Sequence, residues 1–185
     1  MDKEWSVWGN ERNIFKLLTH SEGSSVNMLE ILLQDKLSFR LIDHQVIPGS
    51  EIQPEVQTVL QTTDPIIRRV SAWIYRNELI AYQQLLAPVN VMLESQTEEL
   101  DGDGEPLEKQ IDHLETQRKI VYTGFESSQT ASEYLNPIRL PKDMYPVKET
   151  HLISSGSVCF VLKELFDAEL ILRQIRLQFR KEIFM

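Results

Sequence analysis

The sequence predicts an α+β fold, in which helices pack on a single antiparallel β-sheet of about six strands. Three observations lead to this prediction. Runs in which apolar and polar residues alternate recur along the chain, as in half-buried strands. Turn-forming residues connect several of these runs as hairpins, while helical patterns gather early, in the middle and at the end. The chain lacks both an internal repeat and a strict alternation of strands with helices, which disfavours a doubly wound parallel sheet.

The first third of the chain predicts two helices followed by a strand. Residues 13–19 place apolar side chains at helical spacing, and a second helical pattern covers about residues 26–34. Ser24 or Ser25, in the turn between them, can cap the second helix. Residues 37–41 alternate between apolar and polar, which predicts a half-buried strand.

The middle of the chain predicts a hairpin and then a helix. Residues 66–75 are rich in β-branched and aromatic side chains, residues 76–78 can turn, and residues 79–87 form the return strand. The segment 94–105 is acidic and contains glycine, so we expect a loop. Pro106 suits the first turn of the helix that follows.

The last third predicts three strands and a closing helix. Residues 119–125 and 147–153 have strand patterns, and residues 157–166 have the strongest. The polar, proline-broken stretch 127–145 predicts a long excursion over the surface. An amphipathic helix is expected over about residues 168–183; it could pack on its own domain, contact a partner or second copy, or lie on an anionic membrane surface.

Length and charge limit the possible functions. The 185 residues, 42% of them hydrophobic, predict one domain over residues 1–185 with its core at about 20–166. A net charge of −9 argues against a duplex nucleic-acid binder, which needs a basic surface. No run of 18 apolar residues and no secretory signal pattern is present, so we expect no stable membrane insertion and a cytoplasmic location. The oligomeric state is left open.

The residues that bind metals are too few and too scattered to predict a metal site. The single cysteine, Cys159, excludes an intramolecular disulfide and a cysteine-based zinc cage. The four histidines have no close mutual spacing. The acidic loop lacks the glycine and the final glutamate of a calcium loop.

Two charged residues stand out on predicted strand faces. Arg68 shares its face with Val70 and Ala72, and Glu164 shares its face with apolar residues of the last strand. Arg69 is expected on the other side, where a charge is unremarkable. One explanation is a structural ion pair of Arg68 with Glu164 or another carboxylate. The other is that both line a cavity, where Arg68 binds a ligand carboxylate and Glu164 is a general acid or base.

At these residues the chain resembles the chorismate lyase family, over about residues 20–166. Four segments carry the likeness: Gly-Ser-Ser-Val at 23–26, Ile-Arg-Arg-Val at 67–70 with Ala-Pro at 87–88, Pro-Leu at 106–107 with Arg118, and the run 155–166 that ends in Glu-Leu-Phe. The resemblance implies an antiparallel sheet whose helical flaps cover a buried ligand cavity. It also implies a carbon–oxygen lyase that cleaves chorismate to 4-hydroxybenzoate and pyruvate for quinone synthesis, without a cofactor.

The resemblance also implies roles for individual residues. Arg68 would hold a substrate carboxylate and Glu164 would be the catalytic acid or base, while Leu107 and Ser25 would contribute pocket contacts. Gln84 stands where the family has a second arginine, so it would bind substrate by hydrogen bonds alone. The family usually has an acidic residue where this chain has Arg69. These departures suggest a divergent member of the cyanobacterial or plastid type, which would lie in the plastid stroma if plastid-encoded.

A second interpretation is a non-catalytic small-molecule sensor. The effector-binding domains of some bacterial transcription regulators share the fold that the resemblance implies. The 20 residues before the predicted core are too few for a helix-turn-helix, which favours the lyase. A third interpretation is a structural domain in which Arg68 and Glu164 merely pair.

Overall fold

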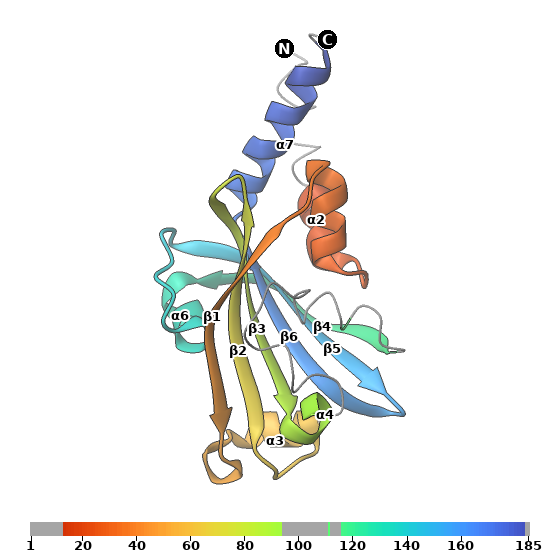
Figure 1. Cartoon of the computed structure of the whole chain (residues 1–185), viewed down its shortest axis with the longest axis vertical. Helices are drawn as coiled ribbons and strands as arrows, with labels where there is room; N and C mark the ends of the chain where they lie inside the picture. The colour runs from red at the N-terminus through yellow and green to blue at the C-terminus, as the bar shows by residue number, and fades with distance from the viewer. Residues whose placement is uncertain (1–12, 94–110, 112–115, 184–185) are drawn as a thin grey trace.

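The computed structural model describes residues 13–93, 111 and 116–183, and it contains one antiparallel sheet in the order β1-β2-β3-β6-β5-β4 (Figure 1). The strands are β1 (Ser38–Ile47), β2 (Ile66–Tyr75), β3 (Glu78–Pro88), β4 (Gln117–Ser127), β5 (Met144–Ser154) and β6 (Ser157–Phe166). The helices are α2 (Ser25–Leu33), α3 (Pro54–Leu60), α4 (Val89–Leu93), α6 (Ser128–Leu135) and α7 (Ala168–Ile183), with residues 13–20 also helical and a 3₁₀ turn, η1 (Gly49–Glu51). The predicted α+β class with a six-stranded antiparallel sheet is confirmed.

Tight turns fix the register of two hairpins. Between β2 and β3, Arg76 and Asn77 both have positive φ, at 48° and 67°, as a two-residue type I′ turn requires. Ser155 and Gly156 do the same between β5 and β6, with φ of 52° and 83°. The turns set the pairing next to them, and one irregularity in each hairpin, at Trp73/Ile74 and at Leu152/Ile153, shifts the register before the regular pairing continues.

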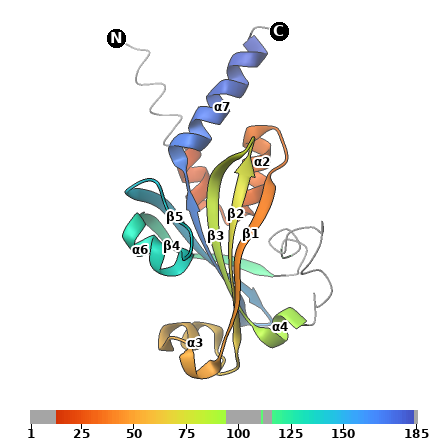
Figure 2. The same ribbon diagram turned by 60° about the vertical axis from the view of Figure 1, so that its left-hand side comes forward.

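Helices cover both faces of the sheet (Figures 1 and 2). We call one side the α2 face; it carries Trp73, Leu85 and Glu164, and α2 and α4 lie on it. We call the other the α6 face; it carries Val70 and Leu165, and α3 and α6 pack there. Each face therefore has its own apolar core, and the strands β2, β3 and β6 between them are buried over most of their length.

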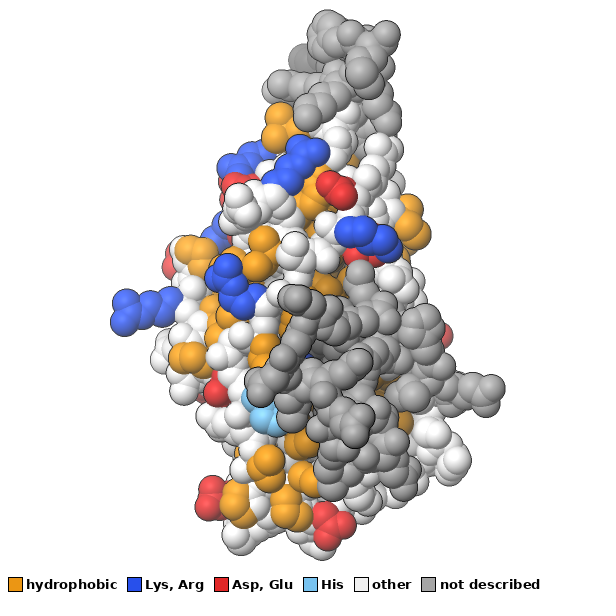
Figure 3. Space-filling model, viewed as in Figure 1, with side chains coloured by type: hydrophobic (Ala, Val, Ile, Leu, Met, Phe, Trp, Pro, Cys, Tyr) orange, Lys and Arg blue, Asp and Glu red, His pale blue; other side chains and the backbone are white. Residues whose placement is uncertain are grey.

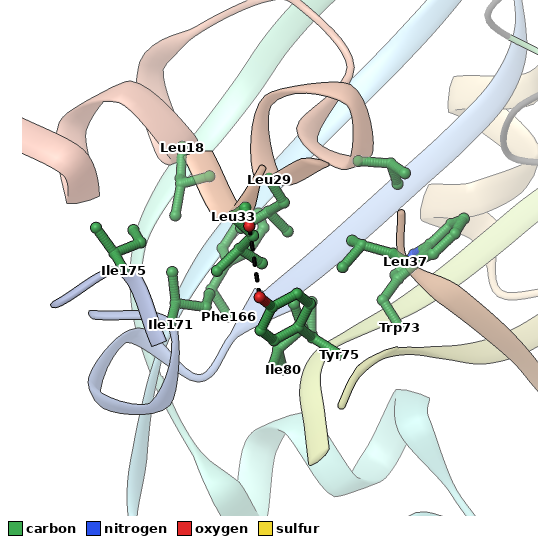
Figure 4. Close-up of a cluster of buried hydrophobic side chains, with 12 residues drawn as sticks. Leu18, Leu29, Leu33, Leu37, Trp73, Tyr75, Ile80, Phe166, Ile171 and Ile175 are labelled. Atoms are coloured by element: carbon green, nitrogen blue, oxygen red, sulfur yellow. Dashed lines mark hydrogen bonds between the residues drawn. The ribbon is translucent and has the colours of Figure 1, made fainter. Parts of the chain in front are cut away.

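One cluster on the α2 face joins α2 and α7 to the sheet (Figure 4). Leu33 of α2 and Ile175 of α7 belong to this cluster together with Phe166 and Trp73 of the sheet, and Leu33 lies between Ile175 and Trp73. The Tyr75 hydroxyl donates a hydrogen bond to the Leu33 carbonyl at 3.4 Å. The first half of α7 is thus fixed by packing on the sheet and α2.

Two helices depart from the sequence-based expectations. Helix α3 was not predicted, although Pro54 at its start is a common first residue of a helix. The segment 127–145 is more than a surface excursion, because it contains α6, capped by the Ser127 side chain, which accepts a hydrogen bond from the Thr130 N–H at 3.1 Å. Leu135 of α6 is fully buried on the sheet. The helix expected after Pro106 lies outside the described residues, except for Ile111, which is helical and buried.

Charged side chains and the absence of a membrane-spanning helix among the described residues characterise the surface. On the side seen in Figure 3, several Lys and Arg side chains lie in the upper half and others at mid-height on the left. Arg173 and Arg176 of α7 are exposed. Within residues 13–93, 111 and 116–183, no helix is both long and apolar enough to cross a membrane.

Replacing Leu33 by Ala is expected to lower the free energy of unfolding by about 2–5 kcal/mol, because it leaves a cavity under α2. Ile31→Ala on the same helix is the matched control, since Ile31 is 75% exposed and its loss should cost no more than about 0.5 kcal/mol. Urea denaturation followed by circular dichroism measures both. Equal losses in the two variants would contradict this packing of α2.

Candidate functional site

Arg68 and Glu164 lie on opposite faces of the sheet. Arg68 pairs with Leu86 across β2 and β3, whereas Glu164 of β6 pairs with Gln83. Leu86 and Gln83 are three positions apart, and because side chains alternate along a strand, residues an odd number apart point to opposite sides. The expectations that these two charges pair or line one cavity are therefore wrong.

Arg68 instead holds the end of α6 on the α6 face. Its guanidinium pairs with Asp43 at 2.5 Å and donates hydrogen bonds to the carbonyls of Tyr134 and Asn136 at 2.9 and 2.8 Å. These carbonyls lie at the helix C-terminus, where a cation is favoured. The structural explanation, an ion pair of Arg68 with another carboxylate, fits this geometry.

Gln84 has the same surroundings as Arg68. It lies on the α6 face, opposite Val70 and Lys163, and its side-chain amide donates to the Tyr134 carbonyl at 3.0 Å. Placed there, Gln84 cannot share a pocket with Glu164. The expectation that Gln84 and Glu164 contact one substrate is therefore wrong on geometric grounds.

Glu164 is buried in a network with Ser25 and Lys148. The Ser25 hydroxyl donates to Glu164 Oε2 at 2.9 Å and accepts from Lys148 Nζ at 2.7 Å. Lys148 Nζ lies 3.6 Å from the same carboxylate oxygen and also donates to the Ser21 carbonyl at 3.1 Å. The Lys148 side chain is 1% exposed and that of Glu164 is 9% exposed, so the two charges compensate each other out of solvent.

The start of α2 places Ser25 over the sheet. Ser24 is the N-cap, and its hydroxyl accepts from the Asn27 N–H, so Ser25 is the first helical residue. The helix N-terminus carries partial positive charge, which favours the nearby carboxylate of Glu164. The structure thus brings together two of the sequence-predicted site residues, Ser25 and Glu164.

A row of polar side chains crosses the α2 face beside Glu164. Direct cross-strand pairing aligns Ser71, Gln83, Glu164 and Lys148 on β2, β3, β6 and β5. We call these four residues the polar row; at the usual strand spacing it spans about 14 Å. All four are buried, between the apolar cluster around Trp73 and a second cluster that includes Leu85 and Leu162. Polar groups in such a position need partners.

Several polar atoms around this row have none. Among the described residues, the buried side-chain atoms without a hydrogen-bond partner are His44 Nδ1, Arg69 Nε, Trp73 Nε1, Gln83 Oε1 and Thr150 Oγ1. The strand pairings put all of them on the α2 face. Unpaired buried polar atoms are rare, and gathering on one face makes them a candidate ligand-binding surface.

Arg69 is the most informative of these residues. It is 7% exposed, lies on the α2 face, and has no carboxylate of the described chain within ion-pair distance. The expectation that its charge is unremarkable is wrong, because the side of the sheet on which it lies is covered. A buried cation without an anion costs several kcal/mol, which a bound anion would offset.

His44 is the cross-strand neighbour of Arg69 at the β1 edge of this surface. Burial and the adjacent Arg69 charge lower the pKa of His44, while Asp43 acts in the opposite direction more weakly. The imidazole is therefore disposed to be neutral near pH 7 in the ligand-free protein.

Sequence reasoning missed Lys148, Arg69, Gln83, His44 and Thr150. For Lys148 and Arg69 the alternation along the strand was visible, but both faces of each strand carry polar residues, so the pattern does not tell which face is covered. Leu107, the remaining predicted contact, lies outside the described residues.

Comparisons with known proteins identify the fold. A scan against family models finds no match, and a search of curated proteins finds no relative. Among solved structures, the chain resembles the ligand-binding domain of a protein assigned to the GntR family of transcriptional regulators from Bordetella bronchiseptica, with a TM-score of 0.52 and 11% identity, over 70% of this chain and 84% of that one.

Two further structures match similarly. The effector-binding domain of the trehalose repressor of Bacillus subtilis gives a TM-score of 0.50 and 14% identity, over 71% of this chain and 90% of that one. A Staphylococcus aureus gene product, SA0254, gives 0.54 and 8%, over 75% and 88%. At these identities the likeness shows a shared fold alone. The descriptions of these neighbours do not name chorismate lyase.

Replacing Lys148 by Met is expected to lower the free energy of unfolding by about 3–5 kcal/mol, because it leaves Glu164 buried without its cation. The double variant Lys148→Met with Glu164→Gln should be more stable than Lys148→Met alone. The control is Lys119→Met on β4, whose side chain is exposed. Urea denaturation at pH 7 measures these variants and the single variant Glu164→Gln, and a loss in the double variant equal to the sum of the two single losses would contradict the coupling.

Proposed function

We propose that this chain binds a small molecule on its α2 face, over the polar row, as a ligand-binding module and not as an enzyme. One observation carries the proposal: the buried polar atoms without partners, Arg69 Nε among them, gather on this one face. A surface of this kind, with a few convergent polar groups between apolar clusters, has the composition that is typical of small-molecule sites.

In this proposal Arg69 takes the role that the sequence suggested for Arg68. The two arginines are adjacent in β2 and point to opposite sides, so only one of them can share a ligand with Glu164. The Arg68 guanidinium already has Asp43 and two carbonyls as partners. Arg69 is buried and lacks a carboxylate partner in the described part of the chain, which supports a ligand anion as its partner.

The contacts of Glu164 support binding over catalysis. Its Oε2 atom already accepts a hydrogen bond from Ser25 and lies beside Lys148, and this network ties the start of α2 to the sheet. A catalytic acid or base needs its reactive oxygen within reach of the substrate proton. The structural neighbours described as ligand-binding and effector-binding domains of regulators also support a binding role for this fold.

The second candidate is a chorismate lyase that supplies 4-hydroxybenzoate for quinone synthesis. The contact between Ser25 and Glu164 favours it, because the resemblance predicted both residues for one pocket and they lie 2.9 Å apart. In this reading Arg69 would hold a chorismate carboxylate, and the second oxygen of Glu164 would act on the proton that leaves the ring.

The two adjacent arginines give a matched test of the binding site. Arg69→Gln is expected to weaken binding at least tenfold while leaving the melting temperature equal or higher, because it removes an unpaired buried charge. Arg68→Gln is expected to lower the melting temperature by detaching α6, while the folded protein binds with unchanged affinity. Thermal shift and calorimetry with a panel of small carboxylates and phosphate esters, including chorismate and 4-hydroxybenzoate, measure both effects. Loss of binding in folded Arg68→Gln with Arg69→Gln unaffected would contradict the proposal.

The lyase candidate has its own test. Purified protein is incubated with chorismate, and 4-hydroxybenzoate and pyruvate are followed by chromatography beside Glu164→Gln and the control Glu149→Gln, a substitution on the α6 face. The lyase predicts product from the wild type and the control and at least a hundredfold less from Glu164→Gln that is still folded. No product from the wild type rejects the lyase and leaves the binding proposal standing.

A further inference from the structure

We propose that the anionic group of the ligand binds between Arg69 and His44, at the β1 end of the α2 face, and that His44 takes up a proton when the ligand binds. This inference rests on the proposed small-molecule function and adds to it the chemistry of one end of the ligand and a dependence on pH.

The geometry of the two side chains supports a shared anion. His44 and Arg69 are direct cross-strand partners in β1 and β2, so their side chains leave the sheet about 5 Å apart on the same side. Each has a buried nitrogen without a partner in the described chain, Nδ1 of His44 and Nε of Arg69. An oxyanion placed between them accepts from both nitrogens and supplies the charge that Arg69 lacks.

Lys148, the cation of the polar row, is less suited than Arg69 to bind the anionic group of the ligand. Lys148 Nζ already contacts the Ser21 carbonyl, the Ser25 hydroxyl and Glu164. An anion there would meet the Glu164 carboxylate, which repels it, whereas Glu164 lies three strands away from His44 in the sheet. The residues proposed to bind the anion, His44 and Arg69, are therefore separate from the uncharged hydrogen-bonding group of Thr150. Leu85 and Leu162 lie between Arg69 and Thr150 in the same cross-strand row.

Proton uptake follows from the charges that surround His44. Arg69 on β2 opposes protonation, Asp43 on β1 favours it, and burial opposes it most, so the pKa of His44 lies below its ordinary value of 6.5 in the free protein. A bound anion offsets the positive charge of Arg69 and favours the protonated form of the imidazole, which donates a stronger hydrogen bond to the anion than the neutral form. Binding then raises the pKa, and affinity must increase as the pH falls from above the bound-state pKa to below the free-state pKa.

Sulfate is the probe for this inference, because it stays dianionic from pH 7.5 to 5.0. Its affinity for the full chain is measured by calorimetry at intervals over that range, and the His44 ring is followed by NMR with and without sulfate. We expect about tenfold tighter binding at pH 5.5 than at pH 7.5, and a His44 pKa that rises in sulfate. His44→Gln should remove the pH dependence, and Arg69→Gln should abolish binding.

His151→Gln is the matched control, since His151 lies on the α6 face beside Glu149 and its loss should change nothing. The titration of His44 in the wild-type protein needs no variant and so does not depend on whether His44→Gln folds. If sulfate binding requires Arg69 but its affinity changes neither with pH nor in His44→Gln, this inference is overturned and the proposed function stands. Absence of any binding that depends on Arg69, to sulfate or to the panel of carboxylates and phosphate esters, would overturn both.

Discussion

The buried pair of Lys148 and Glu164 is the interaction on which the arrangement of the α2 face depends. Two charges taken out of water are tolerated only when they compensate each other and find hydrogen bonds, and Ser25 and the Ser21 carbonyl provide those bonds. This requirement fixes the start of α2 over β5 and β6. The apolar side of α2 then packs in one cluster with Trp73 of the sheet and with α7, so the polar contact at the start of α2 also bears on the position of α7.

The two neighbouring arginines of β2 have different roles: Arg68 holds the fold together, and Arg69 is proposed to bind the ligand. Arg68 has an anion and two carbonyls of the chain as partners, and it fastens α6 to its face. Arg69, one residue further, is more deeply buried than Arg68 but has no such carboxylate partner in the described chain. Both residues are arginines largely removed from solvent, and what distinguishes them is their partners. A site for an anion is thus marked by a cation whose charge the fold leaves uncompensated.

Local patterns predicted most of the sheet but little of the site. The hairpin of β2 and β3 and the bounds of β6 followed from turn residues and alternation, which are short-range properties. The polar row depends on register across strands far apart in sequence, as in the pairing of Gln83 with Glu164 and of Glu164 with Lys148. Alternation also correctly predicted that Arg68 and Arg69 lie on opposite faces of the sheet, but it does not tell which face a helix covers. Helix α6 was missed because its few apolar residues, Ala131 and Leu135, leave a weak pattern among polar ones.

The length of helix α7 determines how far its tip moves when a ligand near Glu164 shifts α2. The helix packs against α2 through Ile171 and Ile175, and further along Gln178 donates a hydrogen bond to the Leu33 carbonyl. As a whole, α7 points away from the sheet (Figure 1). With 16 residues, α7 is about 24 Å long. If α7 tilts as a rigid body by about 5° about its start, its tip moves by about 2 Å. Because α7 is packed and hydrogen-bonded to α2, a tilt that accompanies a movement of α2 displaces the tip of α7 more than its start.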